Sequence, residues 1–349
     1  MQVTRHISKR ALLVVAGALL VSGSAARLAL ARNAVPAARP LEAGIVVIDT
    51  NLRYEGSQAA GTGMVLTSSG EVLTNNHVIE GATSIRVVVP QTGRRYTATV
   101  LGYDLSADTA LLKLKGASGL ATVSTGDSTN LERGQHVRAV GNAGGTGRLT
   151  IVKGTITGLG KTITATNDQG NSERLSGLIE TNANIQPGDS GGPLLDGAGR
   201  VVGMDTAASA AGGGFYYQNA TNDAYAIAIG KAMAVVEKIE AGHASATVHI
   251  GATAFLGIQV ASPGSGYGYG GTQAGAIVAG VVTGSPAAKA GLAYGDEITA
   301  IDGHAVASPN AVVSRLLRKH PGDKVTLAWV DPYGYRRTSS LTLASGPPQ

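Results

Sequence analysis

The sequence predicts a mainly β protein whose first two thirds fold as two β-barrels. Short apolar, β-branched runs recur along the chain and are separated by glycine-rich turns. Glycine accounts for 50 of the 349 residues, about twice its usual share of ~7%. Many short strands with such turns are typical of small barrels, and a chain of this length is expected to hold two or three domains.

The first barrel is predicted over roughly residues 41–125. Its strands are expected at 45–48, 63–66, 72–74, 84–89, 95–101 and 109–114. The strands of the second barrel are expected at 137–142, 154–159, 177–181, 201–204 and 224–229. A helix over 231–241 follows, with Met233, Val236 and Ile239 on one face, and this spacing indicates an amphipathic helix that closes the barrel.

Three motifs supply a histidine, an aspartate and a serine in that order. They are TNNHV around His77, DLSADTAL over 104–111, and GDSGGP around Ser190. A serine hydroxyl is a poor nucleophile at neutral pH, so it needs a base such as imidazole, and a buried carboxylate fixes the imidazole tautomer. The glycines beside Ser190 admit the substrate closely and allow backbone N–H groups to face a developing oxyanion. The acid is either Asp104 or Asp108.

In these motifs the chain resembles the trypsin-like serine proteases, and more closely their bacterial HtrA/Deg branch, which joins the protease to a C-terminal PDZ domain. The resemblance implies a double β-barrel with the catalytic residues His77, Asp108 and Ser190 on loops at the barrel junction. It favours Asp108 because the family's acid directly precedes an apolar strand, which leaves Asp104 as a turn residue. It also implies that the amides of Gly188 and Ser190 form the oxyanion hole.

The resemblance also points to a substrate pocket. Asn184 stands where the pocket floor is expected and is uncharged, and Ile185 is expected to narrow the pocket, so small or medium aliphatic P1 residues are predicted. Asp205 replaces the Asn usual in the branch, on a strand that lines the pocket; an inward carboxylate there would favour basic P1 residues. Asp189 also replaces an Asn. Because glycine, and no basic cleavage site, precedes the strand at 45–48, we interpret Asp189 as a polar loop residue with local backbone partners.

The C-terminal part is similar to a PDZ domain, an α+β partial barrel. The run over 285–303 matches the SPAxxAGLxxGDxIxxIDG pattern of HtrA PDZ domains. The preceding FLGI resembles the loop whose amides receive a peptide C-terminus. Its predicted peptide-binding residues are Phe255, Leu256, Gly257 and Ile258. Ser308 and Pro309 predict the start of a helix that continues to about His320, and 262–275 is expected to be a flexible insertion.

The N-terminus is typical of a secretory signal. A basic region with Arg5, Lys9 and Arg10 precedes an apolar run over 11–21, which is short for a membrane span. A small-x-small site lies at 29–31, and 24–26 is a second candidate. Cleavage there would lower the formal net charge from +5 to +1. An uncleaved anchor is the alternative. We expect a bacterial protein that is secreted or in the cell envelope.

The predicted organisation is a signal peptide (1–31), an N-terminal segment (32–43), a protease domain (44–240), a linker (241–251) and a PDZ domain (252–345). With no cysteine and no HExxH motif, no metal or cofactor is predicted. We expect a serine endopeptidase in protein quality control, with protein or peptide substrates and peptide C-termini as partners; the alternative is a PDZ-based binding or chaperone protein. Nucleic-acid binding has no support, since there is no basic stripe. Homo-oligomerisation stays open.

Overall fold

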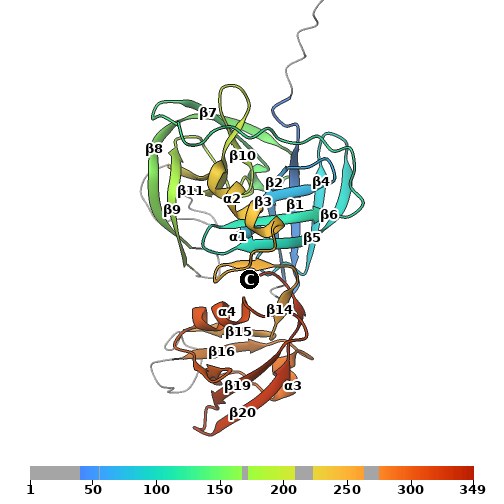
Figure 1. The fold of residues 1–349 in the computed structure, drawn as a ribbon, viewed down its shortest axis with the longest axis vertical. Coiled ribbons are helices and arrows are strands. Elements are labelled where there is room, and N and C mark those ends of the chain that lie inside the picture. Colours follow the sequence, from blue (N-terminus) through green and yellow to red (C-terminus); the bar gives the residue numbers. More distant parts are fainter. Residues whose placement is uncertain (1–39, 55, 167–171, 209–222, 263–274) are drawn as a thin grey trace, which may run out of the picture. The chain divides into compact units, whose positions relative to one another are not determined.

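The computed structural model describes residues 40–54, 56–166, 172–208, 223–262 and 275–349. In this part of the chain a seven-stranded sheet and a closed six-stranded barrel come first, and a two-stranded and a six-stranded sheet follow, as the colours of Figure 1 let the reader follow along the sequence. The predicted mainly β class, with a trypsin-like double barrel and a PDZ domain, is confirmed. The predicted signal peptide and nearly all of the insertion at 262–275 lie outside the described residues.

The first sheet has the strand order β13-β5-β4-β1-β2-β3-β6, and an additional pairing of β5 with β6 closes it. Its strands are β1 (Ile45–Leu52), β2 (Ser57–Val65), β3 (Glu71–Thr74), β4 (Ser84–Val89), β5 (Arg94–Asp104), β6 (Thr109–Leu114) and β13 (Val248–Ile250). Inward side chains such as Val46, Val72 and Leu112 are buried in one cluster. Burial of this apolar cluster stabilises the barrel that carries the histidine and the acid.

The second sheet is a closed barrel in the order β10-β11-β12-β9-β8-β7. Its strands are β7 (His136–Gly141), β8 (Thr150–Thr166), β9 (Ser172–Thr181), β10 (Pro193–Leu195), β11 (Val201–Ala208) and β12 (Ala224–Ala228). The closing helix, α2 (Ile229–Glu240), buries Ala232, Val235, Val236 and Ile239. Met233 is only partly buried, so the buried face is rotated slightly from the predicted one.

The third sheet follows the order β15-β16-β17-β19-β20, with β18 paired to β17, and a separate pair joins β14 to β21. These strands are β14 (Thr253–Phe255), β15 (Ile258–Ala261), β16 (Ala276–Val281), β17 (Glu297–Ile301), β18 (His304–Ala305), β19 (Lys324–Val330), β20 (Arg336–Thr342) and β21 (Ala344–Gly346). Two helices, α3 (Pro286–Ala290) and α4 (Pro309–Leu316), accompany them. The Ser308 side chain accepts a hydrogen bond from Ala311 N and caps α4, which ends before the predicted limit at His320.

Part of the expected linker at 241–251 is a strand of the first sheet. Its last part is β13, which pairs antiparallel with β5 at the edge of the first sheet. Val248 and His249 are buried there. The hydrophobic effect and the strand pairing therefore hold this part of the segment on the barrel.

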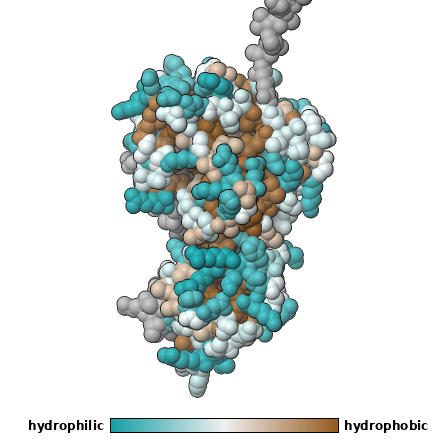
Figure 2. All heavy atoms as spheres, in the orientation of Figure 1, coloured by the Kyte–Doolittle hydropathy of each residue, from teal (hydrophilic) through white to brown (hydrophobic). Residues whose placement is uncertain are grey.

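Polar residues are scattered over the face of the molecule that Figure 2 shows. On the face in Figure 2, hydrophilic and hydrophobic residues are intermingled over the barrels. Across the residues that the structure places, no helix has both the length and the apolar character needed to span a bilayer.

Candidate active site

His77 lies on a single helical turn, α1 (Asn76–Ile79), directly after strand β3. Its neighbours Val78 and Ile79 are buried and anchor the turn in the first barrel. The imidazole is 11% exposed, and its Nδ1 lies 2.9 Å from Oδ2 and 3.0 Å from Oδ1 of Asp108. Since a carboxylate only accepts, Nδ1 donates the proton. This leaves the lone pair on Nε2, where a base needs it.

Asp108 occupies the short connection between β5 and β6 and is fully buried. Its φ of 43° is in the left-handed region, which aspartate tolerates better than most residues. The backbone is fixed by Asn75, whose Nδ2 donates to Asp108 O at 2.9 Å. The carboxylate accepts from the His77 amide at 3.0 Å and from the Thr206 hydroxyl. Three donors therefore hold the acid in one orientation.

Asp104, the competing acid, is held in a different set of contacts. Its Oδ1 accepts from Ser106 N at 2.9 Å, from Ser106 Oγ at 2.8 Å and from Ala107 N at 3.3 Å. This is the local pattern by which an aspartate closes a turn. The acid that contacts His77 is Asp108, and Asp104 shapes the loop that presents it.

Ser190 lies on the tight loop between β9 and β10, where glycine is required sterically. At Gly188 (φ 99°) an added Cβ would lie 2.3 Å from Asn142 O, and at Gly191 (φ 83°) 2.1 Å from Thr62 O. No side chain fits at such distances. The two glycines therefore allow the serine loop to approach both barrels at once.

The backbone amides of the serine loop divide into two groups. The amides of Asp189, Gly191 and Gly192 donate to backbone carbonyls at 2.8–3.0 Å. For Gly188 and Ser190, the two residues expected to form the oxyanion hole, no acceptor is present among the described residues. Among the described residues, the amide of Ser190 itself and that of Gly188 are therefore available to an incoming oxygen.

Two threonines that the sequence analysis missed join the barrels at the site. Thr206 on β11 donates to Asp108, and its carbonyl accepts the Ser190 hydroxyl at 3.4 Å. Thr62 on β2 donates from Oγ1 to Gly188 O at 2.7 Å, and its amide donates to Ser190 O at 2.8 Å. The only sequence signal for Thr206 is its place directly after Asp205, and nothing in the sequence marks Thr62.

The three predicted pocket residues differ in accessibility. Asn184 is exposed, and its Oδ1 accepts from Gln186 Nε2 at 2.7 Å. Ile185 is buried, and Asp205 is wholly buried. Burial and the nearby Asp189 raise the pKa of the Asp205 carboxyl well above its ordinary value. A neutral, buried carboxyl is a weak partner for a basic P1 side chain.

The predicted PDZ loop is fixed by the start of α3. Gly257 has a φ of 83°, and a Cβ there would lie 2.2 Å from the Ser285 Cβ. The Gly257 carbonyl accepts from Val282 N at 2.9 Å, and the Leu256 carbonyl accepts from Ala287 N at 3.0 Å. The amides of Leu256 and Gly257 have no acceptor among the described residues. They remain available for a peptide carboxylate, as the loop prediction requires.

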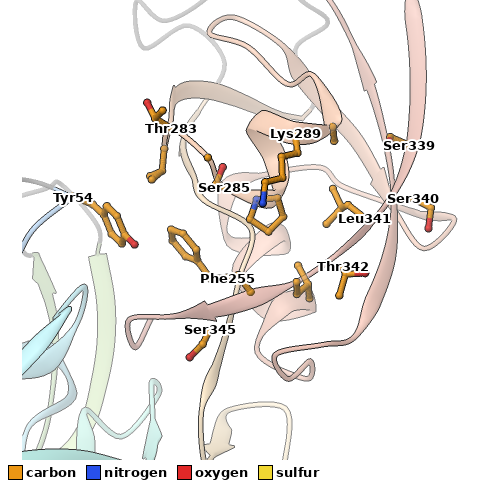
Figure 3. A pocket seen from close by; sticks show the side chains of 16 residues that line it. Tyr54, Phe255, Thr283, Ser285, Lys289, Ser339, Ser340, Leu341, Thr342 and Ser345 are labelled. Atoms are coloured by element: carbon orange, nitrogen blue, oxygen red, sulfur yellow. The ribbon is translucent and has the colours of Figure 1, made fainter.

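A pocket of about 570 Å³ lies beside this loop, and Figure 3 shows Phe255, Ser285, Lys289 and the strand residues Ser339 to Thr342 around it. The Phe255 ring stacks on Tyr54 with the ring centres 5.1 Å apart. In the described ranges, no three His, Cys, Asp or Glu side chains gather in a way that could bind a metal ion.

Comparisons with known proteins match this organisation. Residues 61–204 match the trypsin-like peptidase domain, and residues 277–331 match the PDZ domain. The chain belongs to the HtrA-type serine proteases. It is 31% identical to the serine protease PepD of Mycobacterium tuberculosis over 86% of this chain and 63% of PepD. It is 34% identical to the periplasmic pH-dependent serine endoprotease DegQ of Escherichia coli over 77% of this chain and 56% of DegQ.

The chain spans about three fifths of the length of these curated relatives. Among solved structures, the HtrA-type protease AlgW with a tripeptide is similar at 28% identity, with a TM-score of 0.49, over 88% of this chain and 95% of that one. The two matched domains and their order place the chain in the HtrA-type family.

Proposed function

We propose that this chain is a serine endopeptidase in which Ser190 is the nucleophile, His77 the base and Asp108 the orienting acid. The observation that carries the proposal is the contact between His77 Nδ1 and the Asp108 carboxylate. Thr206 links that pair to the Ser190 hydroxyl across the two barrels. The three groups have the chemical roles that acyl transfer needs.

In the proposed reaction His77 Nε2 takes the Ser190 proton as Oγ attacks the peptide carbonyl. For this step the hydroxyl leaves the Thr206 carbonyl, to which its bond is long at 3.4 Å, and turns toward the imidazole. Such rearrangement on substrate binding is common, because catalytic hydrogen bonds are often loose before the substrate arrives. Asp108 stabilises the imidazolium, which then protonates the leaving amine, and water releases the acyl group by the reverse steps.

The unpaired amides of Gly188 and Ser190 would stabilise the tetrahedral oxyanion. Loss of one such donor typically lowers the rate on the order of 10²–10³-fold. The glycines at 188 and 191 support this role, because a Cβ at either position would displace the loop.

We propose a preference for small or medium aliphatic P1 residues. Asn184 brings no charge to the pocket, Ile185 adds apolar bulk, and the Asp205 carboxyl is buried and its pKa is raised. Cleavage-site profiling on a peptide library tests this, and a dominant Lys or Arg signal at P1 would contradict it.

We also propose that the PDZ domain receives peptide C-termini at Phe255–Ile258, and that the protein acts in extracytoplasmic quality control. The free amides of Leu256 and Gly257 support the first part. N-terminal sequencing of protein from the envelope and the medium tests export: a chain that begins near Arg27 or Arg32 is expected, and recovery with Met1 only in the cytosol would contradict it. A binding or chaperone protein with secondary proteolysis is the alternative, supported by the same PDZ amides.

The test of the proposed chemistry is casein hydrolysis by Ser190→Ala. We expect a loss on the order of 10⁶ in kcat with unchanged circular dichroism and melting. Ser176→Ala, at an exposed position on β9, is the matched control and should retain full activity. Hydrolysis by Ser190→Ala near the level of the unmodified protein would remove Ser190 from the mechanism and favour the binding alternative.

A further inference from the structure

Two buried carboxyl groups have no part in the proposed reaction: one is in the serine loop, and the other is on the strand whose backbone contacts that loop. Asp205 is on β11 and Asp189 is in the loop itself, and they are 0% and 2% exposed. Both oxygens of Asp205 and Oδ1 of Asp189 are buried, and none of the described residues gives them a hydrogen bond. The fourth oxygen, Asp189 Oδ2, accepts from Gln186 N at 2.9 Å.

The shortage of donors makes full ionisation of this pair costly. A buried carboxylate without donors loses its hydration and gains nothing in return, and two such charges close together repel each other. Burial raises the pKa of Asp189 to about 6. Burial, and then the charge of Asp189, raises the pKa of Asp205 well above its ordinary value.

The surrounding elements bring no compensating cation among the described residues. On β7, Gly141 faces Asp189 so closely that a Cβ would lie 2.4 Å from Oδ1. Beyond Thr206, the next ionisable groups are Asp108 and His77, which pair with each other. On β12, β9 and β8, Tyr225, Glu180 and Lys161 form a network of their own. No described Lys, Arg or His forms an ion pair with either carboxyl.

Both residues are built into the backbone that positions the nucleophile. Asp205 O accepts from Gly191 N at 2.9 Å, and Asp205 N donates to Gly192 O at 2.8 Å. The Asp189 carboxyl accepts Gln186 N, while Asp189 N donates to Gln186 O at 3.0 Å. This reciprocal pair closes the turn that carries Gly188. A displacement of either carboxyl would therefore move the amides on both sides of Ser190.

We propose that the buried Asp205 carboxyl holds a proton while Asp189 is ionised, and that this proton keeps the serine loop in its productive position. With this proton present, the Asp205 carboxyl is neutral and needs no compensating donors, and the Asp189 carboxylate retains the Gln186 amide. Loss of that proton at alkaline pH leaves two buried charges, and the loop shifts. Asp189 and Asp205 are then positioning residues of the reaction, an inference that rests on the proposed role of Ser190.

The stability consequence has a defined sign. A carboxyl whose pKa is higher in the folded than in the unfolded chain lowers stability as the pH rises from about 4 through its folded pKa. The loss is complete above the folded pKa, which is about 6 for Asp189; burial raises the pKa of Asp205 well above its ordinary value. Asp205→Asn removes one charge and adds an amide donor. It should therefore stabilise the protein at pH 8 and have little effect near pH 4.5.

The first measurement is the melting temperature of the full chain in a Ser190→Ala background, with and without Asp205→Asn, at pH 4.5 and pH 8. We expect Asp205→Asn to raise the melting temperature at pH 8 by at least about 2–4 °C and to leave it nearly unchanged at pH 4.5. Asp196→Asn is the matched control. Asp196 is also buried in the second barrel, but it accepts from Ala198 N, Arg200 N and Arg200 Nε, so this change should lower the melting temperature at pH 8. An Asp205→Asn chain that is no more stable at pH 8, or equally more stable at both pH values, would overturn the proposal.

The second measurement is the pH profile of the reaction of Ser190 with a fluorophosphonate. The rate of the unmodified protein should fall at alkaline pH, and Asp205→Asn should extend the plateau upward. Identical profiles would refute the positioning role. If Asp205→Asn does not fold, Asp189→Asn serves in both measurements with the same expectations. Because the melting experiment uses Ser190→Ala, its result stands even if Ser190 proves not to be the nucleophile.

Discussion

The two barrels hold the proposed catalytic groups in different ways. In the first barrel, the Asp108 carboxylate accepts from the His77 amide, the His77 ring and Thr206. In the second barrel, the loop with Ser190 leaves two amides without acceptors among the described residues, and both oxygens of Asp205 and one oxygen of Asp189 lack donors in the same part of the chain. The base and the acid are thus fixed before substrate arrives, whereas the nucleophile loop has unsatisfied polar groups that substrate and a proton can satisfy.

This difference has a physical reason. A base must present one tautomer in one direction, so catalysis is favoured when the hydrogen-bonding groups that orient the base all have partners. An oxyanion hole must keep its donors unpaired until charge develops on the substrate, so it is stabilised by the surrounding fold. Thr62 provides that support from the first barrel, with its amide and hydroxyl on Ser190 O and Gly188 O.

The largest effect on kcat should follow from removal of the negative charge of Asp108 in the first barrel. Asp108→Asn should lower kcat about 10⁴-fold, because an amide at this place favours the wrong tautomer of His77. Asp104→Asn is the matched control at a buried turn aspartate and should keep most of the activity. Steady-state kinetics on casein and on a short peptide measure both. If Asp104→Asn lost more activity than Asp108→Asn, the acid would be Asp104, and the role proposed for Asp108 in the first barrel would be wrong.

An intermediate effect should follow from the residue that joins the two regions. Thr206→Val keeps the side-chain shape but removes the donor to Asp108. Hydrogen bonds to charged groups contribute about 1.5–3 kcal/mol, so we expect kcat to fall roughly 10–100-fold with KM little changed. Thr181→Val is the control, since Thr181 on β9 donates from Oγ1 to Thr155 O at 2.9 Å. Equal losses in the two variants would indicate a general effect on the barrel.

The smallest effect on chemistry is expected from the PDZ loop, which also presents unpaired amides next to a strained glycine. Gly257→Ala places a Cβ against Ser285 and should slow cleavage of proteins with apolar C-termini while hydrolysis of short peptides is unchanged. Gly284→Ala, also at positive φ (76°) but with nothing within 4 Å, is the control. Equal loss on short peptides would show that the loop acts on the catalytic site and does more than recruit substrates.

The sequence predicted the parts of the site that depend on local chemistry. Strands β4 and β6 have the expected limits, 84–89 and 109–114. His77 and Asp108 meet as expected, and the amides of Gly188 and Ser190 are the unpaired ones. Each of these follows from a motif in which residue type and backbone conformation are both constrained.

The sequence could not reveal contacts between distant strands. Thr62 and Thr206 lie in ordinary strand patterns and acquire their roles only when the barrels meet. The same holds for Asp205, whose carboxyl was weighed as a pocket residue but is fully buried beside Asp189. Asp189 has the expected local partner in Gln186 N, but its unpaired oxygen depends on the tertiary burial. Strand β13 was interpreted as linker because three residues are too few for a periodic signal.

The most direct test of the account is the reaction of the full chain with a fluorophosphonate, followed by mapping of the labelled peptide. We expect a single adduct on the peptide with Gly188-Asp189-Ser190, none in Ser190→Ala, and much slower labelling in Asp108→Asn. An adduct on another residue, or equal labelling of Ser190→Ala, would contradict the claim that the first barrel activates a nucleophile held by the second.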